Sequence, residues 1–213
     1  MPPPGIAQIE AAVTGQGLLL MGGLAAEDGG SVILLGTGAA FWPVFSASSE
    51  ALDGDPDPVD RWSLRVVGAL ARTLGATPRY PFGGPPYEPF IAWAKASGRC
   101  FSSPTGMLVH DSVGMMISFR GALHFEQAID DLPTGGASPC TTCAAPCASA
   151  CPVGALSADA AYDVAACHAF LDTDAGAECR LRGCRARRAC PVSAGAGRTD
   201  AQSALHMSAF HRS

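Results

Sequence analysis

The sequence has little charge and almost no lysine. Of its 213 residues 15% are charged, and Lys95 is the one lysine among 14 basic residues. Positions 1–139 hold seven basic and 13 acidic residues (−6), and positions 140–213 hold seven and six (+1), which gives the net charge of −5. Because no basic surface large enough to dominate nucleic-acid binding follows from these numbers, we expect no nucleic-acid partner.

Long apolar runs are also missing. The longest, near positions 17–26, has about ten residues, whereas a helix that crosses a bilayer needs about 20. The first residues, MPPPGIAQIEAAV, carry neither the basic start nor the apolar stretch of a secretory signal. We therefore expect a soluble, cytoplasmic protein without a membrane partner.

What is present is enough apolar material for a folded core, because hydrophobic residues make up 48% of the chain. In the first half, short apolar runs bounded by glycine at 17–23 and 31–36 indicate buried strands. The clearest helix is expected at 57–75, with Asp57 as N-cap and Gly75 at its end. With a shorter helix at 90–97 and a strand, turn and strand at 105–123, the pattern predicts an α/β or α+β fold with one sheet.

The amino-acid composition changes near residue 135. Eight of the nine cysteines lie between Cys140 and Cys190, after the linker-like segment DLPTGGASP. Near the end, Thr199 and Gln202 occupy capping-box positions of a closing helix. We therefore predict two domains, an α/β domain over residues 1–135 and a small cysteine-rich domain with a closing helix over residues 136–213.

The cysteines admit three interpretations: disulfides, zinc or iron–sulfur clusters. Disulfides suit exported proteins, and nothing in the sequence indicates export. Zinc needs four ligands and has no requirement for the Cys-Pro that ends the run CTTCAAPCASACP. That run, C-x2-C-x3-C-x3-C-P, has one residue more than the ferredoxin pattern C-x2-C-x2-C-x3-C-P, and its small intervening residues suit a [4Fe-4S] cluster.

A second Cys-Pro end occurs at Cys190, followed by Pro191. In two-cluster ferredoxins the fourth cysteine of each run ligates the other cluster. This crosswise rule predicts two ligand sets, each drawn from both parts of the segment: the first set is Cys140, Cys143, Cys147 and Cys190, and the second set is Cys151, Cys167, Cys179 and Cys184. We expect at least one [4Fe-4S] cluster and favour two, and we expect the ninth cysteine, Cys100, to be buried or incidental.

The cysteine segment resembles the dicluster ferredoxin module of epoxyqueuosine reductases, in which a Cys-Pro run is followed by a lone cysteine on a short helix and a second Cys-Pro run. Cys167 in YDVAACHAFL matches the lone cysteine, whereas the second run is C-x4-C-x5-C-P where C-x2-C-x3-C-P is usual. Five arginines lie among the cysteines of this run. We interpret them either as a solvated helix face, or as positive charge that raises the cluster potential or binds an acidic electron donor. They are Arg180, Arg182, Arg185, Arg187 and Arg188.

The first domain resembles that of epoxyqueuosine reductase and the cobalamin-processing CblC proteins, which share a nitroreductase-like sheet. The matching stretch is VHDSVGMMISFRGAL, which contains His110, Gly114, Arg120 and Gly121. The resemblance implies a corrinoid or flavin site above the sheet, with His110 and Arg120 as candidate cofactor-binding residues. Tyr80 and Tyr87 flank a Gly/Pro loop and are expected either to line a pocket or to pack.

Together these patterns predict an iron–sulfur redox protein, a nitroreductase/CblC-like sheet-and-helix domain followed by a ferredoxin-like iron–sulfur domain. It would take electrons from a donor protein and pass them to a corrinoid, a flavin or a small substrate, as an iron–sulfur-dependent reductase whose catalytic residues the sequence does not identify. Two alternatives stay open: a ferredoxin-like electron carrier without a catalytic pocket, and a structural zinc protein that binds partners.

Overall fold

The chain forms two compact units in the computed structural model, which describes residues 3–212. The first unit runs to Cys100 and also includes Ser118–Gly136, and the second consists of Phe101–Ile117 and the chain from Ala137 onward. The mixed helix and sheet content confirms the α+β class. The units do not divide at a single point near residue 135, because a segment of 17 residues, 101–117, belongs with the cysteine-rich part.

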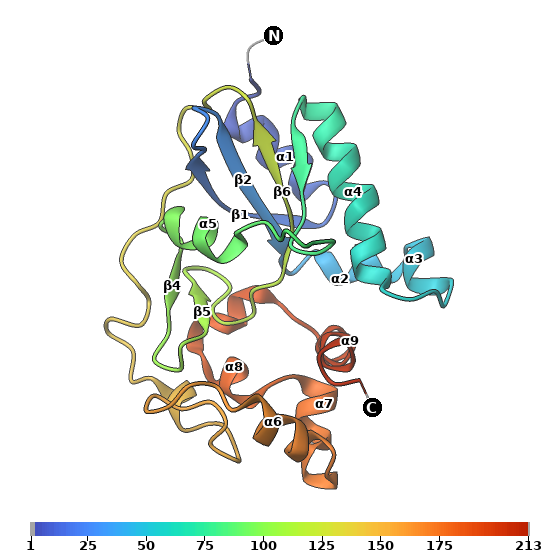
Figure 1. The fold of residues 1–213 in the computed structure, drawn as a ribbon. Coiled ribbons are helices and arrows are strands. Elements are labelled where there is room, and N and C mark those ends of the chain that lie inside the picture. Colours follow the sequence, from blue (N-terminus) through green and yellow to red (C-terminus); the bar gives the residue numbers. More distant parts are fainter. Residues whose placement is uncertain (1–2, 213) are drawn as a thin grey trace. The chain divides into compact units, whose positions relative to one another are not determined.

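A four-stranded antiparallel sheet forms the centre of the first unit (Figure 1). Its strands, in spatial order, are β1 (Leu18–Ala25), β2 (Ser31–Thr37), β6 (Phe119–Phe125) and β3 (Thr77–Arg79). Every residue of β2 is buried, because this strand is central and covered on both faces. The two apolar runs that predicted strands are β1 and β2.

Five helices belong to this unit: α1 (Ile6–Thr14), α2 (Phe41–Ser46), α3 (Ser49–Leu52), α4 (Pro58–Leu74) and α5 (Phe90–Ala96). The helix predicted at 57–75 is α4, which buries Trp62, Val66 and Leu70 and ends at Gly75 with a φ of 71°. Asp57 holds the N-cap position, but its side chain makes no capping hydrogen bond because its own backbone is left-handed, with a φ of 51°. The prediction of Asp57 as the N-cap residue is confirmed, although its side chain does not supply the hydrogen bond.

Close packing fixes α2 against α4, and α4 against the sheet. The ring of Trp62 meets the rings of Phe41 and Phe45 edge-on. Its centroid lies 5.2 Å from that of Phe41 and 6.1 Å from that of Phe45. On β6, a Cβ atom at Gly121 would lie 2.9 Å from the Val67 side chain of α4. Glycine at this position therefore lets helix and strand approach closely.

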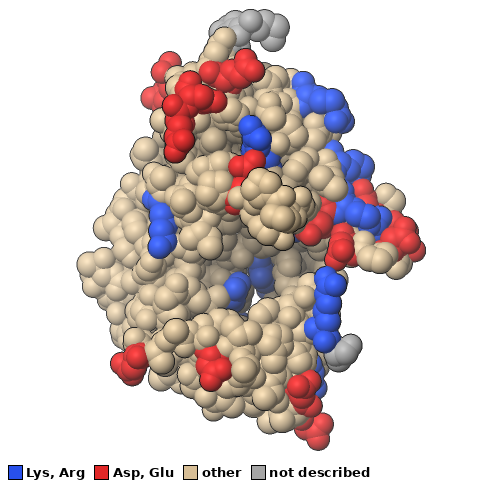
Figure 2. Space-filling model, viewed as in Figure 1, with Lys and Arg blue, Asp and Glu red and all other residues tan. Residues whose placement is uncertain are grey.

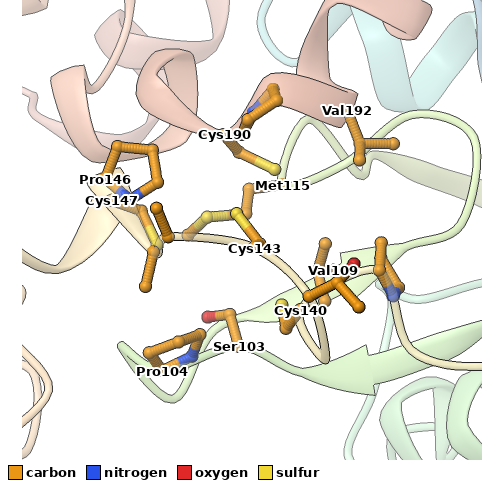
Figure 3. Close-up of a pocket in the computed structure, with 15 residues that line it drawn as sticks. Ser103, Pro104, Val109, Met115, Cys140, Cys143, Pro146, Cys147, Cys190 and Val192 are labelled. Atoms are coloured by element: carbon orange, nitrogen blue, oxygen red, sulfur yellow. The ribbon is translucent and has the colours of Figure 1, made fainter.

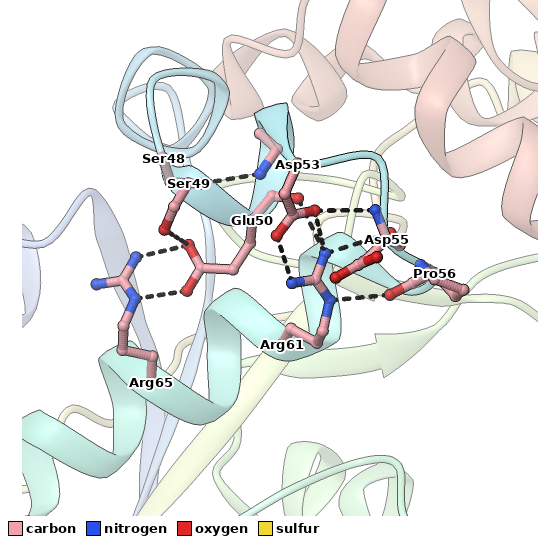
Figure 4. Close-up of polar contacts among 9 residues, drawn as sticks. Ser48, Ser49, Glu50, Asp53, Asp55, Pro56, Arg61 and Arg65 are labelled. Atoms are coloured by element: carbon pink, nitrogen blue, oxygen red, sulfur yellow. Dashed lines mark hydrogen bonds and ion pairs between the residues drawn. The ribbon is translucent and has the colours of Figure 1, made fainter.

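Two ion pairs join α3 and the following loop to α4 (Figure 4). Arg65 donates to both carboxylate oxygens of Glu50, at 2.5 and 2.9 Å, and Arg61 does the same to Asp53, at 2.8 and 2.7 Å. The Arg65 hydrogen bonds lower the pKa of Glu50 from 4.5 to about 2. The buried Glu50 thus anchors the short helix α3 to the long helix α4.

The second unit is built from short elements. Its strands β4 (Cys100–Ser102) and β5 (Leu108–His110) pair with each other, and its α-helices are α6 (Val164–Leu171), α7 (Ala177–Arg182), α8 (Arg185–Ala189) and α9 (Asp200–Phe210). Three 3-10 helices separate them: η1 (Pro146–Ala148), η2 (Asp174–Gly176) and η3 (Pro191–Ala196). The closing helix is α9, where the Thr199 hydroxyl accepts from the Gln202 N–H at 3.1 Å.

The strand, turn and strand expected at 105–123 do not form a hairpin. β5 pairs with β4, whereas β6 pairs with β2 and β3. The turn is a local bridge between His110 and Gly114, closed by hydrogen bonds in both directions. After this bridge the chain returns from the second unit to the first, so the two strands serve different sheets.

Charged side chains do not gather into one large area on the face drawn in Figure 2: a group of acidic residues lies near the top, and acidic and basic residues lie together on the right. Among residues 3–212, no helix is both long and apolar enough to cross a bilayer.

We expect the substitution Glu50→Gln to destabilise the first unit in a pH-dependent way. At pH 7 the loss of the ion pair should lower the free energy of unfolding by about 1 kcal/mol, since Arg65 is half exposed. Because the folded-state pKa of Glu50 is depressed, its contribution is complete above about pH 4.5 and is lost as the pH falls toward 2. Wild type and variant should therefore converge in acid.

Tryptophan fluorescence during urea unfolding measures this effect, because all three tryptophans (Trp42, Trp62 and Trp93) lie in the first unit. The control is Glu10→Gln on α1, an exposed carboxylate for which the described residues offer no ion pair. Equal destabilisation at pH 7 and pH 3 would contradict the role given to Glu50.

Candidate metal centres

The first Cys-Pro run folds into a succession of tight turns. The N–H of Cys143 bonds to the carbonyl of Cys140 at 3.3 Å, and Ala145 takes the left-handed conformation with a φ of 52°. Pro146 then begins η1, which contains Cys147. Small side chains in this loop permit the turns, and as a result three cysteines that lie within eight residues face a common space.

Cys190 joins these three from the other end of the cysteine segment. Helix α8 ends at Ala189, Cys190 itself is extended, and Pro191 starts η3, so the backbone changes direction at this residue. The sulfur-bearing side chains of the first set line one cavity of about 280 Å³ (Figure 3). These are Cys140, Cys143, Cys147 and Cys190, the set predicted by the crosswise rule.

The environment of the first set is apolar. Cys147 and Cys190 are buried in a hydrophobic cluster with Val109 and Met115, and Val192 packs against it. Burial raises the pKa of the Cys147 thiol, as do the nearby sulfurs of Cys190 and Cys140. Burial likewise raises the pKa of Cys140, with a further increase from Cys190 and Cys143. The thiols of Cys140 and Cys147 therefore need a positively charged partner to ionise in this apolar cavity.

One wall of this cavity comes from residues that the sequence analysis assigned to the first domain. Ser103, Val109 and Met115 line the cavity, and the N–H of Met115 donates to the Ser193 hydroxyl at 3.1 Å, just beyond Cys190. Segment 101–117 contains no cysteine of the set, and the sequence analysis related its residues 109–117 to a corrinoid or flavin site instead. The sequence feature that marks this contact is Gly114. Its φ is 57°, and a Cβ atom at this position would lie 2.4 Å from the Ser193 nitrogen, so only glycine fits.

The second set lies around a smaller cavity of about 30 Å³. Its lining includes all four predicted cysteines, namely Cys151, Cys167, Cys179 and Cys184. Tyr162 also lines it and is placed to hydrogen-bond the Cys167 sulfur. Burial is the main cause of the raised pKa values of Cys167 and Cys179, and the nearby Cys184 raises both further. Eight cysteines therefore form two groups of four.

The geometry of the two groups helps to distinguish disulfides, zinc and iron–sulfur clusters. All nine cysteines are free thiols, so no disulfide is present in the part of the chain described. Within residues 3–212 no three His, Cys, Asp or Glu side chains converge closely enough to hold a single metal ion. Tetrahedral zinc draws its sulfurs to about 2.3 Å from one point, whereas the first set surrounds a cavity. A polynuclear cluster suits such a cavity better than one ion does.

Four of the five arginines are engaged by groups of their own unit. Arg185 and Arg188 both bind Glu178, Arg182 binds Asp200 at 3.1 Å, and Arg180 donates to the carbonyls of Leu171 and Thr173. Hydrogen bonds from Arg188 and Arg185 lower the pKa of Glu178.

Arg187 differs from these four. Burial lowers the pKa of its guanidinium, and Cys184 and Tyr162 are the groups that oppose this shift. Its guanidinium is therefore buried near Cys184, a member of the second set.

The two residues suggested for a corrinoid or flavin belong to different units. His110 is completely buried in the second unit, where its Nδ1 lies 3.1 Å from both the Ser112 N–H and an Asp111 carboxylate oxygen. This placement gives His110 a role in the turn before Gly114. Arg120 begins β6 in the first unit, next to Asp60. Cys100 is buried and lies outside the linings of both cysteine cavities.

Comparisons of the chain with protein-family models, with curated proteins and with solved structures found no match.

We expect Gly114→Ala to destabilise the second unit more than backbone strain alone explains. Placing Ala at positive φ costs about 1 kcal/mol, and the clash with Ser193 should add about 1–3 kcal/mol. The control is Gly106→Ala in the same segment, where φ is 76° and nothing lies within 4 Å of the added Cβ. Thermal unfolding by circular dichroism should show the larger loss for Gly114→Ala, and equal losses would refute the contact.

Proposed function

We propose that this chain is an iron–sulfur redox protein that holds two [4Fe-4S] clusters and transfers electrons one at a time. The observation that carries the proposal is the sorting of eight cysteines into two groups of four, each lining its own cavity. Each group combines cysteines from both parts of the segment, as the crosswise rule requires. A protein that used the two Cys-Pro runs as separate zinc knuckles would group them by run instead.

The residues around the first set fit such a cluster. Its walls are apolar, its turn residues are small, and the thiols lie in a cavity of about 280 Å³. When bound, a [4Fe-4S] cluster supplies one-electron redox chemistry. Segment 101–117, through Val109 and Met115, excludes water from one side, and this low polarity is one of the means by which a protein sets cluster potential.

The second set has surroundings that favour a higher potential. Reduction adds a negative charge to a cluster, and a nearby cation or a hydrogen bond to sulfur stabilises that charge. Arg187 and the Tyr162 hydroxyl are placed to do so at Cys184 and Cys167. The residues that line the first cavity include no cation. We therefore assign electron entry to the first set and electron retention to the second.

The destination of the electrons separates a carrier from a reductase. An electron donor protein is required in either case. A corrinoid or flavin acceptor on the first unit stays a hypothesis that rests on the sequence resemblance. The first unit contains a large cavity lined by Arg120, and this observation favours a small-molecule ligand there over a carrier without a pocket.

Iron and sulfide analysis after anaerobic purification tests the cluster assignment. The wild type should contain about eight irons per chain, since each cluster holds four. Cys147→Ala and Cys190→Ala should each leave about four, and so should the double variant, because both residues serve one cluster. Combining Cys147→Ala with Cys184→Ala should leave almost none.

Cys100→Ser is the matched control and should keep all the iron. If the variant that combines Cys147→Ala and Cys190→Ala lost both clusters, the crosswise grouping would be wrong. A colourless wild type with stoichiometric zinc would refute the redox function itself.

A redox titration followed by electron paramagnetic resonance tests the assignment of potentials. Two reduction steps are expected, and Arg187→Gln or Tyr162→Phe should move only the higher one to a more negative potential. Arg182→Gln is the control, because that guanidinium is exposed and paired with Asp200. Equal movement of both steps, or none in either variant, would contradict the assignment.

A further inference from the structure

The first unit contains the cavity lined by Arg120, and the proposed function leaves the class of its ligand open. It has a volume of about 860 Å³ and lies where the first turn of α4, the start of β6, helix α5 and the Gly/Pro loop before α5 meet. Ligand sites usually occupy about 300–1,000 Å³ and combine apolar walls with a few fixed polar groups. This cavity has that composition.

Three phenylalanines contribute to the walls. Phe82 comes from the Gly/Pro loop, Phe90 from α5 and Phe119 from β6. The rings of Phe90 and Phe119 have centroids 5.8 Å apart and planes tilted by 47°, so they meet at an angle. Aromatic side chains arranged in this way favour a flat ring as their contact. Tyr80 and Tyr87 are not among the lining residues, and Tyr80 instead donates to the carbonyl of Leu64.

Arg120 has hydrogen-bond donors that no residue among 3–212 uses. Its side chain is only 14% exposed, and Nη1 binds Asp60 at 3.1 Å. Its Nε is buried and, among the described residues, has no hydrogen-bond partner. The edge formed by Nε and Nη2 is the one that arginine uses to bind a carboxylate with two parallel hydrogen bonds. A buried donor without an acceptor is costly, so a ligand oxygen at this edge would stabilise the unit.

A second cation reinforces this preference. Lys95 also lines the cavity, and within residues 3–212 no ion pair engages it. Of the two acidic residues in the lining, Asp60 binds Arg120, and Glu88 binds Arg79 at 3.2 Å. Burial lowers the pKa of Arg120, which shows that its charge is poorly solvated. The remaining positive charge of the cavity favours an anion.

We infer that this cavity is a binding site for a small aromatic carboxylate, whose ring lies against the phenylalanines and whose carboxylate binds Arg120 and Lys95. Both features are required: the walls select a flat ring, and the unused arginine edge selects a two-oxygen anion. The inference does not depend on the iron–sulfur assignment, because all lining residues belong to the first unit.

Saturation-transfer NMR titrations of the full chain with benzoate test the inference. Benzoate should bind with a dissociation constant of about 1 mM, a usual affinity for so small a ligand. Cyclohexanecarboxylate, which keeps the anion without the flat ring, and benzyl alcohol, which keeps the ring without the anion, should both bind several times more weakly. Equal binding of all three would overturn the inference, and so would the absence of benzoate binding.

Substitutions locate the site. Arg120→Lys keeps a cation beside Asp60 but removes the two-donor edge, and should weaken benzoate binding about tenfold. Lys95→Gln, at an exposed position that is safe for folding, should also weaken it. Arg72→Gln, an exposed charge on α4 outside the cavity, is the control and should bind as the wild type does. Unchanged affinity in both Arg120→Lys and Lys95→Gln would refute the site, and the iron content of these variants would still report on the clusters.

Discussion

Eight cysteines line two cavities in groups of four, and most of the second unit is arranged around these two groups. The first group needs Cys190 beside a loop that ends more than forty residues earlier in the chain. The chain between them therefore has to leave the first cavity, contribute Cys151, Cys167, Cys179 and Cys184 to the second, and return. Short helices separated by turns achieve this, because each helix ends near a residue that lines a cavity. A longer, regular helix would carry these cysteines away from one another.

The second unit is not a continuous stretch of the chain. Segment 101–117 leaves the sheet unit, covers the first cysteine cavity with Val109 and Met115, and returns as β6. The buried His110 and the glycine at position 114 hold this segment in its turn. Because β6 follows directly and is a central strand of the sheet, the folding of the first unit and the covering of the first cavity share a continuous stretch of chain.

Charge is distributed by local pairing. Glu178 alone binds two arginines, and Asp200 binds a third, so the arginine-rich run presents less free positive charge than its composition indicates. Arg187 is instead buried near Cys184. In the first unit, Glu50 and Asp53 are likewise matched by arginines of α4. Against this pattern, Lys95 and the unused edge of Arg120 are conspicuous, and they lie in the same cavity.

Local patterns were sufficient to predict several elements. The apolar stripe and terminal glycine of 57–75 determine α4, and the glycine-bounded apolar runs determine β1 and β2, because helical and strand periodicity are short-range properties. The capping position of Thr199 was also readable. The partners of β5 (β4) and of β6 (β2 and β3) could not be predicted in this way, since strand partners are chosen by contacts between distant residues.

The candidate sites also combine local features, which the sequence shows, with contacts between distant residues, which it does not. By itself the sequence determined the number of cysteines, their small neighbours and the two Cys-Pro ends, because these are local requirements of a thiolate-binding loop. Only the tertiary structure decided that Val109, Met115 and Tyr162 complete the cysteine cavities, and that Arg120 and Lys95 share a cavity with three phenylalanines. Local patterns do not predict these groupings, because the proximity of the residues arises from packing between elements that are far apart in the chain.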